Sequence, residues 1–286
     1  MRRRRWIAAL AALVLVFCLC GNSAAEITPC TICGTHGTAK HLAGRTVVVS
    51  VFASDTGTHW DFSRDKDVER YSICYHDLRM ACEWLTEKAA SYGVKTEFVW
   101  DWLAHFDLYY EHRFDRNMVV YPSDYSVYWE YINSSIPTDE LLCRYDADNI
   151  LYIFHYRTPK KNDVGSHAFP FGELDDDVCG FECVAMFSGL FTDVATPGTY
   201  AHEMLHLFGV PDMYTENKPY QMSKDFIKWY QKHYPWDIMA GAHTGDYSRM
   251  KYSFSDIVAY YAGLCDRPAD ADRWGLRRND FELYGP

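Results

Sequence analysis

Residues 196–212 read TPGTYAHEMLHLFGVPD, and they predict a short helix with clear signals at both ends. Thr196 is a residue type that caps helix N-termini, and Pro197 is well tolerated in the first helical turn. Gly209 supplies the left-handed residue with which many helices end. The sequence therefore predicts a helix over about 197–208, followed by a sharp reversal of the chain.

The predicted helix carries two histidines four positions apart, His202 and His206. Residues at this spacing lie on one face of a helix, so both imidazoles can reach a single metal ion. Glu203 is one position further round, where it can reach a metal-bound water without being a ligand. Asp212 can return as a third ligand after the chain reverses at Gly209. Three protein ligands and one open position are typical of a catalytic zinc site.

This pattern, His202-Glu203-x-x-His206-x-x-Gly209-x-x-Asp212, resembles the extended zinc motif of the metzincin metalloendopeptidases. It is most similar to the snapalysin-like variant, which has Asp as the third ligand. The resemblance implies an enzyme with Zn²⁺ as cofactor, a protein or peptide as substrate, and Glu203 as general base.

Metzincins also have a methionine-containing turn beneath the zinc ion. The segment 234–241, YPWDIMAG, is the candidate for this turn, with Met239 as its apolar residue. The resemblance therefore implies that Gly209 and Met239 are structural supports of the site.

The identity of the third ligand has an alternative, because many metzincins use His at that position. His243 follows Gly241 by two residues and is the rival, or an additional, ligand. Tyr214 and Tyr247 are candidates for supporting an oxyanion, but their residue type and position favour packing roles. A thermolysin-like enzyme would need a Glu ligand on a later helix, and Glu216 is too near the motif for that.

The segments around the motif predict a mixed α/β fold. Strands are expected at 46–53, 94–100, 149–156 and 180–188, and helices at 65–92, 126–133, 138–145, 197–208, 223–233 and 253–264. Residues 101–123 are expected to be irregular, and 157–177 to be a loop.

The order of these segments is similar to that of a metzincin catalytic domain. It implies a twisted, mostly parallel sheet with an antiparallel edge strand, here 180–188, and a long backing helix. A zinc-binding helix, the methionine turn and a C-terminal helix would follow. We expect a single catalytic domain over 45–286, preceded by a short segment at 26–44.

The first 25 residues have the layout of a secretory signal peptide. A run of arginines is followed by the apolar stretch 7–20 and by the small residues Ser23, Ala24 and Ala25. We expect cleavage after Ala25 and secretion. The alternative is lipid attachment at Cys20 on the cell surface. No later stretch is long and apolar enough for a transmembrane segment.

The chain is acidic, with a formal net charge of −11. Removing the first 25 residues takes away four arginines and no acidic residue, which makes the charge −15. A protein this acidic repels phosphate backbones, so nucleic acid is not an expected partner. Eight cysteines follow the signal peptide, and in an exported protein this even number favours disulfides. The pairing, the oligomeric state and the cleavage preference are left open.

A second function is compatible with the same motif. The protein could be a secreted or cell-surface binding protein that keeps the metal-binding fold without turnover. The intact Glu203 favours the enzyme, because this residue has no role in binding the metal itself.

Overall fold

The computed structural model describes residues 41–120, 125–158, 165–169, 183–187, 195–218, 220–241 and 250–278. All of them belong to one compact unit, Gly34–Pro286. The strands are β1 (Gly44–Ser54), β2 (Thr96–Val99), β3 (Tyr109–Arg113), β4 (Asn149–Tyr156), β5 (His167–Phe169) and β6 (Cys183–Met186). The helices are α2 (Asp65–Ser91), the short 3-10 helix η1 (Phe106–Leu108), α3 (Tyr125–Ser135), α4 (Thr138–Tyr145), α5 (Pro197–Leu207), α6 (Lys224–His233), α7 (Asp256–Tyr261) and α8 (Ala269–Trp274). The predicted signal peptide and Cys20 lie outside the described residues.

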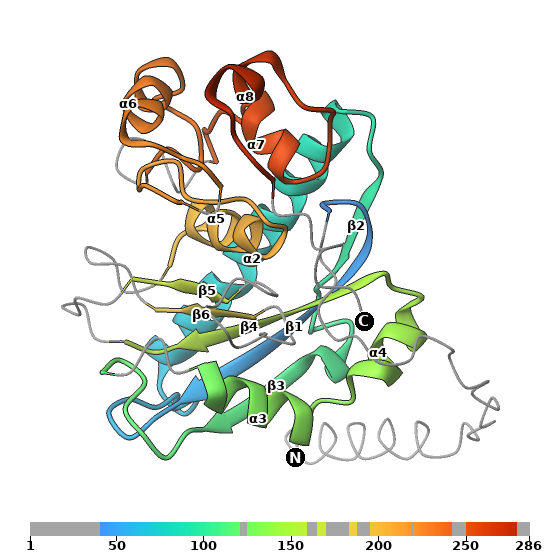
Figure 1. The fold of residues 1–286 in the computed structure, drawn as a ribbon. Coiled ribbons are helices and arrows are strands. Elements are labelled where there is room, and N and C mark those ends of the chain that lie inside the picture. Colours follow the sequence, from blue (N-terminus) through green and yellow to red (C-terminus); the bar gives the residue numbers. More distant parts are fainter. Residues whose placement is uncertain are drawn as a thin grey trace, which may run out of the picture. The chain divides into compact units, whose positions relative to one another are not determined.

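The six strands that the structure describes form one mixed, mostly parallel sheet in the order β2-β1-β4-β6-β5 (Figure 1). Strand β1 is its centre. It pairs in parallel with β4 along one edge, and its other edge is shared by β2, which pairs with the first half, and β3, which pairs with the second. Most of β1 and all of β4 are buried, as expected for strands covered on both faces. The prediction of a mixed α/β fold is confirmed at this level.

Helices cover both faces of the sheet (Figure 1). On one face, Tyr71 of α2 packs on Phe52 of β1, with ring centroids 4.8 Å apart. On the other face, Tyr128 of α3 packs on Phe154 of β4 at 4.7 Å. Helix α5, which carries the two histidines, packs beside the long helix α2.

The prediction that residues 180–188 form the edge strand of the sheet is wrong. The strand found within 180–188, β6, is internal and pairs with both β4 and β5. The antiparallel edge strand is β5, in a segment predicted to be a loop. Three residues are too few to show an alternating pattern, so β5 left no signal in the sequence.

The expectation of irregular structure over 101–123 is also wrong in part. This segment contains η1 and the strand β3. Strand β3 has the sequence YYEHR and is only partly buried. A strand at the edge of a sheet keeps one side in solvent, so its charged residues obscured the apolar pattern.

The C-terminal part differs from its prediction in two details. Helix α7 is capped by Ser255, whose side chain accepts a hydrogen bond from the Val258 amide at 3.3 Å, and not by Ser253. A further helix, α8, follows it. The long helix, α4, β4, α5 and α6 agree with their predicted ranges to within one or two residues.

No helix among the described residues is long and apolar enough to cross a membrane. No disulfide links any two of the five cysteines found in that part of the chain, which are Cys74, Cys82, Cys143, Cys183 and Cys265. The other three cysteines that follow the signal peptide lie outside it. The predicted disulfides therefore have no support among these five.

Candidate metal centre

Helix α5 begins and ends as its sequence predicts. The Thr196 hydroxyl accepts a hydrogen bond from the Thr199 amide at 3.3 Å, and Pro197 is the first helical residue. Gly209 has a φ of +82°, and its amide donates to the His206 carbonyl at 2.9 Å. This left-handed residue turns the chain back along the helix, which brings the next residues beside the last turn.

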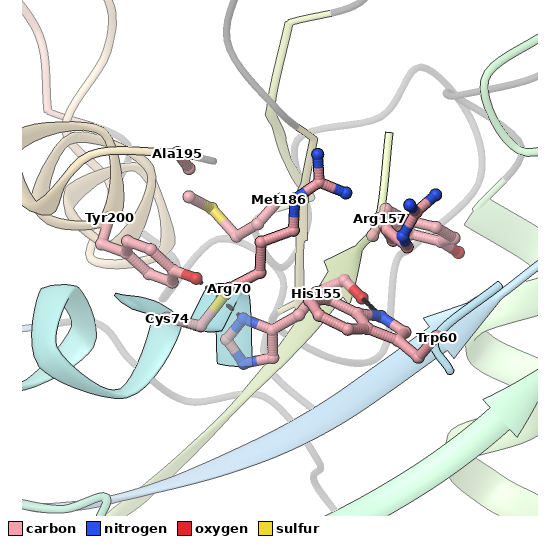
Figure 2. Close-up of a pocket in the computed structure, with 9 residues that line it drawn as sticks. Trp60, Arg70, Cys74, His155, Arg157, Met186, Ala195 and Tyr200 are labelled. Carbon is pink, nitrogen blue, oxygen red and sulfur yellow. Dashed lines mark hydrogen bonds between the residues drawn. The ribbon is translucent and has the colours of Figure 1, made fainter. Parts of the chain in front are cut away.

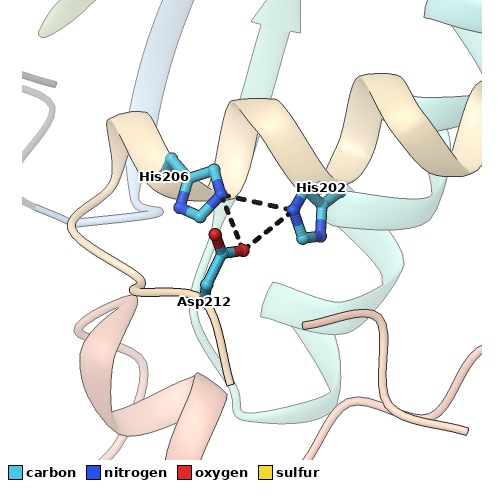
Figure 3. A group of neighbouring side chains, drawn as sticks. All are labelled: His202, His206 and Asp212. Carbon is cyan, nitrogen blue, oxygen red and sulfur yellow. Dashed lines mark hydrogen bonds and ion pairs between the residues drawn. The ribbon is translucent and has the colours of Figure 1, made fainter. Parts of the chain in front are cut away.

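The reversal places Asp212 against the two histidines (Figure 3). Oδ1 of Asp212 lies 3.2 Å from Nε2 of His202 and 3.2 Å from Nε2 of His206. The two Nε2 atoms are themselves 3.2 Å apart. Three potential ligand atoms from the predicted residues thus form a nearly equilateral triangle, and among the described residues this is the group that could hold a metal ion.

Backbone carbonyls orient both imidazole rings. Nδ1 of His202 lies 3.0 Å from the carbonyl oxygen of Ile238, and Nδ1 of His206 lies 2.7 Å from that of Val210. Because a carbonyl only accepts, each Nδ1 must be the protonated nitrogen and the donor. In a neutral imidazole this leaves the Nε2 lone pair facing the triangle, which is the arrangement found at histidine metal ligands.

The Asp212 carboxylate and the two Nε2 lone pairs converge on one point, and a positive charge there would stabilise all three groups. Oδ1 of Asp212 is a buried oxygen that accepts no hydrogen bond with suitable geometry. Burial acts to lower the pKa of His206, but the Asp212 carboxylate outweighs it and raises that pKa to about 9. Burial likewise acts to raise the pKa of Asp212, and the two imidazoles lower it well below its usual range. A proton or a metal ion can satisfy this demand.

A zinc ion fits the triangle. Zinc binds His and Asp at about 2.0–2.2 Å, and the edges of a zinc tetrahedron with such bonds are about 3.3–3.6 Å long. A triangle with 3.2 Å edges is close to one face of that tetrahedron. His202, His206 and Asp212 would hold the ion, and a fourth position would be left for water or substrate.

The three residues line a cleft of about 500 Å³. Glu203, which is 7% exposed, lines the same cleft one position along the helix from His202. The same cleft is also lined by Ser166, His167 and Ala168, from the edge strand β5 and the residue before it. The predicted base and the edge of the sheet therefore border one cavity with the candidate ligands.

The segment 234–241 is close to the site, as predicted for a methionine turn. Met239 is fully buried, and its carbonyl accepts a hydrogen bond from the amide of Met213, the residue after Asp212. The preceding carbonyl, that of Ile238, is the one that orients His202. The turn thus forms a hydrogen bond with the candidate ligand His202 and another with Met213, the residue after the candidate ligand Asp212.

Of the further candidates for the site, Tyr214 is among the described residues, whereas two others are not. The ring of Tyr214 stacks on that of His202, with centroids 6.2 Å apart and planes at 17°, and it lines the cleft. His243 and Tyr247 lie outside the described residues. Sequence reasoning missed the role of Asp237, whose carboxylate accepts from the Met239 amide at 2.8 Å. The position of Asp237, two residues before Met239, is the feature of the sequence that could have suggested this role.

A buried pair ties α5 to the sheet (Figure 2). Nδ1 of His155 in β4 lies 2.8 Å from the hydroxyl of Tyr200, two residues before His202. Both side chains are about 1% exposed. This contact joins the middle of the sheet to the helix that carries His202 and His206.

A scan against protein-family models finds no match to this chain, and a search of curated proteins finds none either. The case for a function therefore depends on the geometry of the site.

Proposed function

We propose that the protein is a secreted zinc-dependent endopeptidase of the metzincin type. The observation that carries the proposal is the convergence of His202, His206 and Asp212 at 3.2 Å spacings on one side of a cleft that Glu203 also lines. The order of strands and helices and the turn at Met239 are further support for the metzincin relationship.

A catalytic role for the metal is favoured over a structural one. Structural zinc sites commonly have four protein ligands and are closed, whereas catalytic sites have three and an open position. Here three ligand atoms border an open cavity that is large enough for part of a peptide chain. Asp212 replaces the third His found in many metzincins and, when ionised, reduces the net charge of the centre by one.

Glu203 is the general base in the proposed mechanism. When bound, zinc supplies Lewis-acid activation of the attacking water and the scissile carbonyl. Glu203 accepts the proton of that water and passes it to the leaving amine nitrogen as the C–N bond breaks. The stacked phenol of Tyr214 is at the border of the cleft, where its hydroxyl is a candidate donor to the developing oxyanion.

The edge strand β5 is the proposed docking site for an extended substrate. A strand added to a sheet edge gains backbone hydrogen bonds, and side-chain pockets give selectivity. Ser166, His167 and Ala168 line the same cleft as Glu203. A peptide paired with β5 would therefore cross the cleft in front of the metal centre.

The second candidate is a non-catalytic binding protein with the same fold. It has the same ligands, so metal content alone does not separate the two functions. Hydrolysis of an unfolded protein such as casein, inhibited by a chelator and restored by Zn²⁺, is expected only of the enzyme.

The decisive comparison is wild type against Glu203→Gln, with Glu69→Gln on the exposed side of α2 as control. Removal of a general acid–base group typically lowers turnover by roughly 10²–10⁴-fold. We expect Glu203→Gln to bind one zinc per chain and to lose peptide hydrolysis by that factor, and the control to behave as wild type. Full hydrolysis by Glu203→Gln would refute the assigned base, and absence of hydrolysis by a zinc-loaded wild type would favour the binding protein.

A further inference from the structure

One peptide unit in the turn at Met239 forms a side-chain hydrogen bond through its carbonyl and another through its N–H. This is the Ile238–Met239 peptide, whose carbonyl accepts from Nδ1 of His202 at 3.0 Å. The N–H of the same peptide donates to Oδ1 of Asp237 at 2.8 Å. The carboxylate of Asp237 is therefore linked through one rigid, planar group to a candidate zinc ligand.

The two hydrogen bonds and the peptide dipole between them are aligned, so that the negative charge of Asp237 strengthens each of them. A carboxylate that accepts from a peptide N–H draws that group's positive end toward itself and leaves the carbonyl oxygen more negative. Hydrogen bonds in such a series polarise one another. A more negative Ile238 carbonyl is a better acceptor for the Nδ1 hydrogen of His202, which makes Nε2 of that ring more electron-rich.

Asp237 is built into the fold at this position. Its side chain is 2% exposed, and its second oxygen, Oδ2, accepts from the Ser255 amide at 2.7 Å, at the start of α7. Burial raises the pKa of Asp237 to about 6, against the two amide hydrogen bonds, which lower it. The group is therefore largely ionised at pH 7.5, and both of its oxygens are fixed.

The second histidine has no equivalent link. His206 donates to the Val210 carbonyl, and the next residue is Pro211, which has no N–H. The Val210–Pro211 peptide cannot pass on the charge of a carboxylate. The two histidine ligands are thus supported differently, and His202 alone of the pair is joined to an acidic side chain through a peptide.

We propose that Asp237 is a positioning residue for the metal centre, which orients and polarises the His202 imidazole through the Ile238–Met239 peptide. The inference rests on the proposed metal site. It concerns the affinity and electronic character of that site, and it holds whether or not the bound metal performs hydrolysis.

The first measurement is Zn²⁺ affinity by chelator competition at pH 7.5, for wild type, Asp237→Asn and a matched control. The control is Asp55→Asn. Asp55 is also buried, at 1% exposed, and its carboxylate also accepts from backbone amides, among them that of Met118 at 2.9 Å. Within the described part of the chain, the hydrogen bonds of the Asp55 carboxylate go to Gly57, Thr58 and Met118, and none of these residues is a candidate ligand or bonds to one.

Loss of a residue that supports a metal ligand typically weakens metal binding by roughly 10–100-fold. We expect this loss for Asp237→Asn, together with a changed visible spectrum of the Co²⁺-substituted protein, and an unchanged affinity for Asp55→Asn. Equal zinc affinity in Asp237→Asn and wild type would overturn the inference. A loss as large in the control would overturn it too, because the effect would then be general destabilisation.

The second measurement uses the wild-type protein, so it decides the matter even if Asp237→Asn does not fold. In a ¹⁵N-labelled sample, added Zn²⁺ should move the Met239 amide proton downfield, because metal on Nε2 makes the Nδ1 hydrogen of His202 a stronger donor along the chain. The Gly209 amide, which is only three residues from His206 and from Asp212 but donates to the His206 carbonyl and not to a group linked to Nδ1, should move less. A Met239 shift no larger than that of Gly209 would overturn the proposal.

The two proposals fail in different ways. If the wild type binds no zinc, both the proposed function and the role of Asp237 are wrong. If the wild type binds zinc and Asp237→Asn binds it equally well, only the role of Asp237 is wrong.

Discussion

Asp212 completes the candidate site because the two histidines beside it already have their Nδ1 hydrogens bonded to backbone carbonyls. His202 and His206 each use their single ring hydrogen on a backbone carbonyl, so neither can donate a second hydrogen to the carboxylate without taking up a proton. The carboxylate is close to two lone pairs, and a cation is the natural partner for all three groups. This is a stronger argument for a metal than the spacing of the motif.

Replacement of Asp212 by Ala tests the third ligand directly. Loss of a supporting residue already costs roughly 10–100-fold in metal affinity, so loss of a direct ligand should cost more than roughly 100-fold. Chelator competition with Zn²⁺ measures it. The same experiment on His243→Ala should show wild-type affinity. The reverse result would assign the third ligand to His243.

His155 gives the protein a specific sensitivity to acid. Burial lowers the pKa of His155 to about 3, whereas an unfolded histidine has a pKa of about 6.5. Between these values the unfolded state binds a proton that the folded state does not. The free energy of unfolding should therefore rise with pH across this window, by up to about 1.4 kcal/mol per pH unit and about 5 kcal/mol in all.

Urea unfolding of metal-free wild type and His155→Gln, at several values between pH 3.5 and 7, measures this contribution. Other titrating groups are common to both proteins and cancel in the difference. The variant should be less stable than wild type at pH 7 and approach or exceed it as the pH falls. Parallel pH profiles would show that His155 has the same pKa in the folded and unfolded states, which would contradict the prediction.

The sequence predicted which three candidate ligands and which candidate base come together at the cleft, but not what orients them. His202, His206 and Asp212 could be inferred from the helical period and the glycine. The acceptors at Ile238 and Val210 are backbone carbonyls, which every residue has, so no residue type marks them. Asp237 carries a side chain that can be read, but only the turn geometry shows that it accepts from Met239.

At the scale of elements, the end of α5 is as important as the helix itself. Gly209 has a left-handed backbone, and for a residue with a Cβ this conformation costs roughly 1–2 kcal/mol. Gly93, after α2, has a φ of +75°, and a Cβ at this position would meet no other atom within 4 Å. Gly93 therefore shares the backbone conformation of Gly209 but is not part of the site.

Gly209→Ala and Gly93→Ala should lose similar stability, roughly 1–2 kcal/mol in chemical denaturation. Only Gly209→Ala should also weaken zinc binding, because the reversal at this residue sets the position of Asp212. Equal zinc affinity in the two variants would show that Asp212 is positioned by the turn at Met239 and not by the end of the helix.

Elements with strong local signals were predictable and those that depend on neighbours were not. Helix α5 has a cap, a proline and a glycine, and β4 contains the apolar and aromatic run Ile150–Phe154, so both agree with their predicted ranges. Strands β3 and β5 are short and partly polar. They exist because β1 and β6 offer free edges to pair with, and a sequence pattern does not show which edges are free.

At the scale of the whole molecule, metal binding should appear as added stability. A ligand at 100 times its dissociation constant stabilises the folded state by about 2.7 kcal/mol. For a unit of this size each kcal/mol corresponds to about 2–4 °C. Excess Zn²⁺ should therefore raise the melting temperature of the metal-free protein by about 5–10 °C, measured by calorimetry with and without a chelator. The His202→Ala, His206→Ala double variant should show no such rise.

The position of β1 at the centre of the sheet has a consequence for how the chain is made. Its partners β2, β3 and β4 follow it in the order of synthesis, so its two edges are fully occupied only once residue 156 has been translated. The candidate ligands come later still, at 202–212. A chain that folds in the order of its synthesis can therefore assemble the middle of its sheet before the candidate ligands are in place, and binding of an ion there would be a late step of folding.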